Sequence, residues 1–88
     1  MAVVIEQDVI CRKLCEFIQA NLVAPGIGVG PTTSLTQLGL DSFSIIEIVL
    51  FIERQYGLTL PDVALSKENI ESPQAFAACV HHYLQGHH

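Results

Sequence analysis

Ser42 is the residue of this chain whose surroundings best suit covalent chemistry. It follows the turn Gly39-Leu40-Asp41 and is itself followed by an apolar run. A serine at the start of a helix can act as a cap, accepting a hydrogen bond from a backbone N–H of the first turn, and Asp41 could do the same. The helix N-terminus also carries partial positive charge and unpaired N–H groups, which would stabilise a phosphate attached to the hydroxyl. Two interpretations follow: a simple cap or an attachment point.

Other reactive side chains make weaker sites. A serine hydrolase would need the pattern G-x-S-x-G between a strand and a helix, and Ser42 lacks the second glycine and the strand. Cys79 and His82 could pair on one helix, but no third group orients them. Cys11 and Cys15 are four residues apart within an apolar helix, whereas zinc knuckles are compact and lie in loops. We therefore expect buried, inert thiols, no metal site and no catalytic centre.

Composition excludes several classes of partner. The 88 residues carry a net charge of −5, without the lysine and arginine clusters that nucleic acids require. The apolar run from Phe43 to Ile52 is interrupted by Glu47 and is too short to span a membrane. Three cysteines and no secretory signal predict a cytoplasmic protein, and we expect it to be a monomer. We expect one domain over residues 1–88; His87 and His88 could be an appended remnant and are excluded from functional reasoning.

The spacing of apolar residues predicts an all-α fold, a small four-helix bundle with one short member. The first helix covers residues 5–21, and a loop rich in glycine and proline then leads to the second, from Ser42 to Tyr56. Leu35 and Leu38, near the end of this loop, should insert their side chains into the core. A short third helix is expected within residues 62–69. Ser72 and Pro73 begin the last helix as its cap and its first residue.

The second helix carries two apolar stripes. At about 100° per residue, one wide arc faces the core. A separate stripe holds Phe43, Ile46 and Leu50, with Glu47 and Glu53 on its borders. Charged residues around an exposed apolar strip are typical of a surface that binds another protein. The alternative is that the long loop covers this second stripe. The core arc consists of Ile45, Ile48, Val49, Ile52 and Tyr56.

Residues 35–62, LTQLGLDSFSIIEIVLFIERQYGLTLPD, resemble acyl carrier proteins and related phosphopantetheine-binding carrier domains. The family pattern is a Leu-Gly-x-Asp-Ser-Leu/Phe turn, an acidic amphipathic helix, and an aromatic residue followed by a segment that ends in proline. Here the turn covers residues 38–43 and the closing segment covers residues 56–61. The first helix, the long loop and the final helix also lie where the family has them, so the resemblance spans most of the chain.

This resemblance implies that Ser42 receives 4′-phosphopantetheine from coenzyme A through a separate phosphopantetheinyl transferase. Asp41 would help to position the metal and coenzyme A of that transferase. The terminal thiol of the arm would hold acyl or aryl groups as thioesters for acyl-transferring, ketosynthase-type or acyl-activating enzymes, while the protein catalyses nothing itself. The resemblance also assigns partner recognition to the outer stripe of the second helix, namely Phe43, Ile46, Glu47, Leu50 and Glu53.

The acidic pattern departs from that of carriers serving bulk fatty-acid synthesis. Ser44, Arg54 and Gln55 stand where acids are common, which leaves Glu47 and Glu53 on this helix. We therefore expect a carrier in a specialised fatty-acid or polyketide-type pathway, and a length of one domain with no linker predicts that it is free-standing. Two alternatives stay open: an aminoacyl or peptidyl carrier, and an unmodified helical interaction module in which Ser42 is only a cap.

Overall fold

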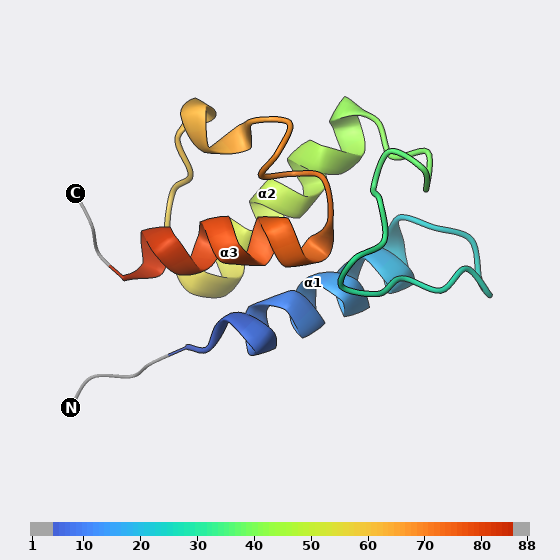
Figure 1. The fold of residues 1–88 in the computed structure, drawn as a ribbon, viewed down its shortest axis with the longest axis horizontal. Coiled ribbons are helices and arrows are strands. Elements are labelled where there is room, and N and C mark those ends of the chain that lie inside the picture. Colours follow the sequence, from blue (N-terminus) through green and yellow to red (C-terminus); the bar gives the residue numbers. More distant parts are fainter. Residues whose placement is uncertain (1–4, 86–88) are drawn as a thin grey trace.

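Three α-helices and one short 3-10 helix form the part of the chain that the computed structural model describes, residues 5–85. The α-helices are α1 (Gln7–Asn21), α2 (Ser42–Tyr56) and α3 (Pro73–Leu84), and the 3-10 helix η1 (Asp62–Leu65) lies between α2 and α3. α1 and α3 lie side by side, and α2 passes behind α3 in the view of Figure 1. No strand occurs in residues 5–85. The all-α class is thus confirmed.

The predicted four-helix bundle is not confirmed, because the expected third helix over residues 62–69 is only the four-residue η1. Ser66 ends it with an extended backbone, and the Ser66 hydroxyl accepts a hydrogen bond from the N–H of Asn69 at 3.3 Å. The Asn69 side-chain amide donates to the carbonyl of Ala64 at 2.9 Å. Because such local side-chain bonds compete with helical ones, the segment turns here.

The other helix limits agree closely with those expected from the sequence. α2 begins at Ser42 and ends at Tyr56, and Gly57 follows with φ +66°, a left-handed conformation that favours glycine. The Ser72 hydroxyl caps α3 by accepting a bond from the N–H of Ala75 at 3.2 Å. Pro73 occupies the first turn, where its missing N–H costs nothing. The first helix starts two residues later than predicted, at Gln7.

The hydrophobic core lies where the three helices meet, and the long loop contributes one side chain to it. Leu35 is only 2% exposed, so its predicted insertion into the core is confirmed, whereas Leu38 is half-buried at the core's edge. Phe17 and Phe51 stack with ring centroids 4.4 Å apart and join α1 to α2. The large helical side chains that are fully buried are Ile10, Leu14, Ile18, Ile48, Ile52, Pro73, Phe76 and Val80.

The long loop over residues 22–41 is fastened at several points before it reaches Ser42. The side-chain amide of Gln19 donates to the carbonyl of Ile27 and accepts from the N–H of Val29 at 2.9 Å. Further along, the N–H of Leu35 donates to the carbonyl of Glu71 at 2.9 Å. These bonds tie the loop both to α1 and to the segment that precedes α3, so the approach to Ser42 has a defined course.

Tyr56 offers a test of the packing at the end of α2. Its hydroxyl is buried and has no hydrogen-bond partner within residues 5–85, and burial raises the pKa of Tyr56. A buried polar group without a partner costs about 1–3 kcal/mol. We therefore expect Tyr56→Phe to leave the free energy of unfolding unchanged or to raise it by about 1 kcal/mol, measured by urea denaturation. A clear loss of stability would show that the hydroxyl has a partner in solution.

Candidate functional site

Asp41 and Ser42 divide the two roles that the sequence left open at the start of α2. Asp41 is the N-cap, and its carboxylate Oδ1 accepts a hydrogen bond from the N–H of Ser44 at 3.0 Å. Ser42 is the first helical residue and is exposed. Within residues 5–85 its hydroxyl makes no hydrogen bond. Capping therefore belongs to Asp41, and the Ser42 oxygen is free to be modified.

The electrostatic environment of Ser42 suits a phosphate. The N–H groups of Ser42 and Phe43 lie in the first turn, where an α-helix supplies no acceptor. Together with the helix dipole they favour negative charge at this end. The N–H of Ser44, which donates to the Asp41 carboxylate, is the main cause that lowers the pKa of Asp41. The N–H of Phe43 also acts on the Asp41 carboxylate, so this end of the helix already stabilises one anion, and the N–H of Ser42 is left for another.

The lowered pKa of Asp41 predicts a pH dependence of stability. A carboxyl group whose pKa is lower in the folded state stabilises the fold above its unfolded-state pKa, about 3.9. That contribution disappears as the pH falls through the lower folded-state pKa. Asp41→Asn keeps a capping oxygen without the charge. We expect wild type to melt above this variant at pH 7 and the difference to shrink below pH 4; a constant difference would contradict the assignment.

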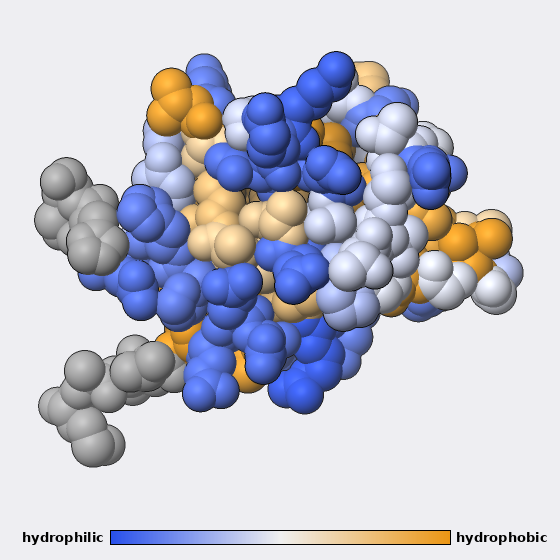
Figure 2. Space-filling model, in the orientation of Figure 1, coloured by the Kyte–Doolittle hydropathy of each residue, from blue (hydrophilic) through white to orange (hydrophobic). Residues whose placement is uncertain are grey.

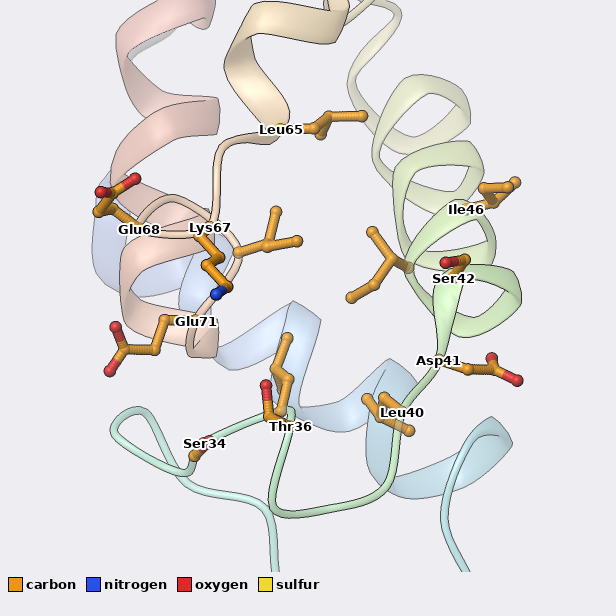
Figure 3. A pocket seen from close by; sticks show the side chains of 13 residues that line it. Ser34, Thr36, Leu40, Asp41, Ser42, Ile46, Leu65, Lys67, Glu68 and Glu71 are labelled. Carbon is orange, nitrogen blue, oxygen red and sulfur yellow. The ribbon is translucent and has the colours of Figure 1, made fainter.

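A cleft of about 830 Å³ opens beside Ser42. It lies between the start of α2, the end of the long loop, and the segment from η1 to α3 (Figure 3). Ser34, Thr36, Asp41, Ser42, Lys67, Glu68 and Glu71 supply its polar rim. Its apolar walls are aliphatic and consist of Leu35, Leu40, Ile45, Ile46, Leu65 and Ile70. An apolar cleft next to a modifiable hydroxyl can accommodate a group attached to that hydroxyl.

The sequence did not indicate the far wall of this cleft. Lys67 lines it, and its amino group points into the cleft, whereas the carboxylates of Glu68 and Glu71 point away (Figure 3). The Asp41 carboxylate also points away from the cleft. The only sequence signal was a single cation in the segment after Pro61. Its proximity to Ser42 depends on the tertiary fold.

The outer stripe of α2 is exposed as predicted. The exposed fractions are 79% for Phe43, 53% for Ile46 and 40% for Leu50, whereas Ile48 and Ile52 on the core arc are 0% exposed. The long loop therefore does not cover this stripe, and that alternative is wrong. One stripe of α2 is thus buried in the core while the other faces solvent, as expected of a helix that both packs and binds a partner.

The two predicted acidic positions on this stripe differ. Glu47 is exposed and free to meet a partner. Glu53 is half-buried, and its Oε2 accepts a hydrogen bond from the N–H of Leu60 at 3.2 Å. Glu53 thus fastens the segment after α2 to the helix, in addition to any role toward partners.

Further apolar side chains are exposed away from α2. Val63 on η1 is 80% exposed, and Ile27 in the long loop is 43% exposed. Figure 2 shows orange groups over η1 and over the tip of the long loop, with hydrophilic side chains across much of the face between them. Within the described residues, no helix has both the length and the apolar character needed to cross a bilayer.

The cysteines form no competing site. Cys79 is buried, its thiol donates to the carbonyl of Ala64 at 3.5 Å, and burial raises its pKa. Burial likewise raises the pKa of Cys11, and that of Cys15 to about 11. Thiols in this state are weak nucleophiles and weak metal ligands. Among residues 5–85, no three His, Cys, Asp or Glu side chains are placed to share a metal ion.

Comparison with known proteins agrees with this site. The family described as "Phosphopantetheine attachment site" matches residues 8–80. The anthracycline acyl carrier protein DauA of Streptomyces sp. (strain C5) is 34% identical over 61 residues, 69% of this chain and 70% of the relative. The anthracycline acyl carrier protein DpsG of Streptomyces peucetius is 33% identical over the same shares. Acyl carrier protein 3, chloroplastic, of Hordeum vulgare is 32% identical over 60 residues, and this alignment spans 67% of the chain but only 45% of the relative.

A solved structure shares the fold. It is a chain from the crystal structure of a Bradyrhizobium japonicum glycine:[carrier protein] ligase complexed with glycylated carrier protein. The TM-score is 0.66, and the match covers 83% of this chain and 96% of that one. The sequence identity is 22%, so this likeness concerns the arrangement of helices.

Proposed function

Because this chain belongs to the acyl carrier protein family, whose prosthetic group is 4′-phosphopantetheine, we propose that Ser42 carries that arm. The terminal thiol of the arm holds acyl intermediates as thioesters, and the protein presents them to partner enzymes without catalysing a reaction. The observation that carries the proposal is the exposed Ser42 hydroxyl at the first position of α2, left unbonded because Asp41 caps the helix.

The cleft supports an acyl rather than an aminoacyl cargo. Six aliphatic side chains form its walls. An acyl chain that packs against them is removed from water, which stabilises the bound chain by about 0.8 kcal/mol per buried CH₂. The ammonium group of an aminoacyl cargo would instead lose hydration against the same walls. The two anthracycline carrier relatives favour a specialised, polyketide-type pathway over bulk fatty-acid synthesis.

The outer stripe of α2 is the proposed docking surface for the transferase and for acyl-transferring, ketosynthase-type or acyl-activating enzymes. Phe43, Ile46 and Leu50 supply apolar contacts, and Glu47 supplies charge that would attract a basic rim on the partner. We place the protein in the cytoplasm as a monomer. Three free cysteines in the structure suit a reducing compartment.

The proposal is tested by incubating the purified protein with coenzyme A and a broad-specificity phosphopantetheinyl transferase. We expect the intact mass to rise by one phosphopantetheine group, and tandem mass spectrometry to place it on Ser42. A carrier of known activity serves as the positive control. An unchanged mass, while that control is modified, would favour the unmodified interaction module instead.

A further inference from the structure

Lys67 is the only cation among the residues that line the cleft beside Ser42. Its side chain is exposed and forms no ion pair with a carboxylate within residues 5–85. Glu68 and Glu71 follow it closely in sequence, yet their carboxylates point away from the cleft while the Lys67 amino group points into it (Figure 3). The structure thus presents an unpaired positive charge on the wall opposite Ser42.

The backbone around Lys67 is held in place on both sides. Before it, the carbonyl of Ser66 accepts from the N–H groups of Asn69 and Ile70 at 3.0 and 3.1 Å. After it, the carbonyl of Glu71 accepts from the N–H of Leu35 in the loop that leads to Ser42. The wall that carries Lys67 is therefore tied to the loop on the Ser42 side. The flexible four-carbon stem of a lysine lets the ammonium adjust to an anion in the cleft.

We propose that Lys67 pairs with the phosphodiester that joins the arm to Ser42 and thereby directs the arm into the cleft instead of into solvent. This inference rests on the proposed modification of Ser42. A phosphodiester has two non-bridging oxygens. The N–H of Ser42, which no acceptor in the first turn engages, suits one of them, and the Lys67 ammonium forms a charge-assisted hydrogen bond with the other.

The chain is well suited to a test, because Lys13 and Lys67 are its only lysines. Lys13 is exposed on α1 and does not line the cleft, so it is an internal control. The unmodified protein and the enzymatically modified protein are treated briefly with an amine-acetylating ester, and acetylation of each lysine is followed by peptide mass spectrometry. We expect acetylation of Lys67 to be about two- to five-fold slower in the modified protein, the range of an exposed ion pair, with Lys13 unchanged.

Phosphorus NMR of the modified protein provides the complementary measurement. Lys67→Gln should shift the phosphodiester signal toward its position in free phosphopantetheine, and Lys67→Arg should largely preserve the wild-type position. The matched variant Lys13→Gln removes the same charge elsewhere and should leave the signal in place. Salt at about 0.5 M should reduce the difference between wild type and Lys67→Gln, because the pair is exposed.

The outcomes separate the two proposals. If intact mass shows no added group, the proposed function fails and this inference fails with it. If the arm is attached but Lys67 is acetylated equally fast with and without it, and Lys67→Gln leaves the phosphorus signal unchanged, the function stands and the role of Lys67 is wrong.

Discussion

Ser42→Ala is expected to abolish the mass increase that coenzyme A and a phosphopantetheinyl transferase produce in the unsubstituted protein. The substitution removes the oxygen to which the phosphodiester bond would form. It should leave the fold intact, since the Ser42 hydroxyl makes no hydrogen bond within residues 5–85 and Asp41 supplies the helix cap. Intact-mass spectrometry measures the loss, and circular dichroism checks that helicity is retained.

Ser44→Ala is the matched control for this result. Ser44 lies in the same first turn of α2. The substitution removes its hydroxyl, which also acts on the Asp41 carboxylate, but keeps the backbone N–H that caps the helix through Asp41. This variant should therefore accept the arm as the unsubstituted protein does. A mass increase that persists in Ser42→Ala would mean that a different hydroxyl is the attachment point and that the proposed site is wrong.

Ile48→Arg is expected to unfold the protein, whereas Ile46→Arg, two residues earlier on the same helix, should leave it folded. Ile48 is 0% exposed, so arginine there would place an unpaired charge in the core at a cost on the order of 4 kcal/mol or more. A domain of this size has a total stability of about 5–10 kcal/mol. Ile46 is 53% exposed, and a guanidinium there stays in water.

Although Ile46→Arg should stay folded, we expect it to lose function. Ile46→Arg should keep its helical circular dichroism and its melting behaviour but lose at least about ten-fold in transfer of cargo to a partner enzyme, because hot-spot contacts are worth about 2 kcal/mol. Leu50→Arg, 40% exposed on the same stripe, should behave alike. Loss of helicity in Ile46→Arg would place the stripe in the core, and undiminished transfer would remove it from the docking surface.

Local signals in the sequence were sufficient for the three α-helices and for the position of Ser42. The glycine after Tyr56 and the Ser72-Pro73 pair specify helix ends through backbone preferences of single residues. The two stripes of α2 follow from the period of the helix, so Ile46 and Ile48 could be assigned to opposite environments without any structure. Each of these features depends on neighbours within a turn or two of the chain.

Only the tertiary structure decided what surrounds Ser42. The choice between Asp41 and Ser42 as cap and the end of η1 depend on local hydrogen bonds that the sequence pattern left open, whereas the cleft itself is made by segments far apart in the chain. The tertiary structure also brought Lys67 to the wall opposite Ser42, through a segment held to the long loop by one backbone bond to Leu35. Periodicity predicts which face of a helix is buried but not which distant segment packs beside it. That choice depends on how the cores of all the elements fit together.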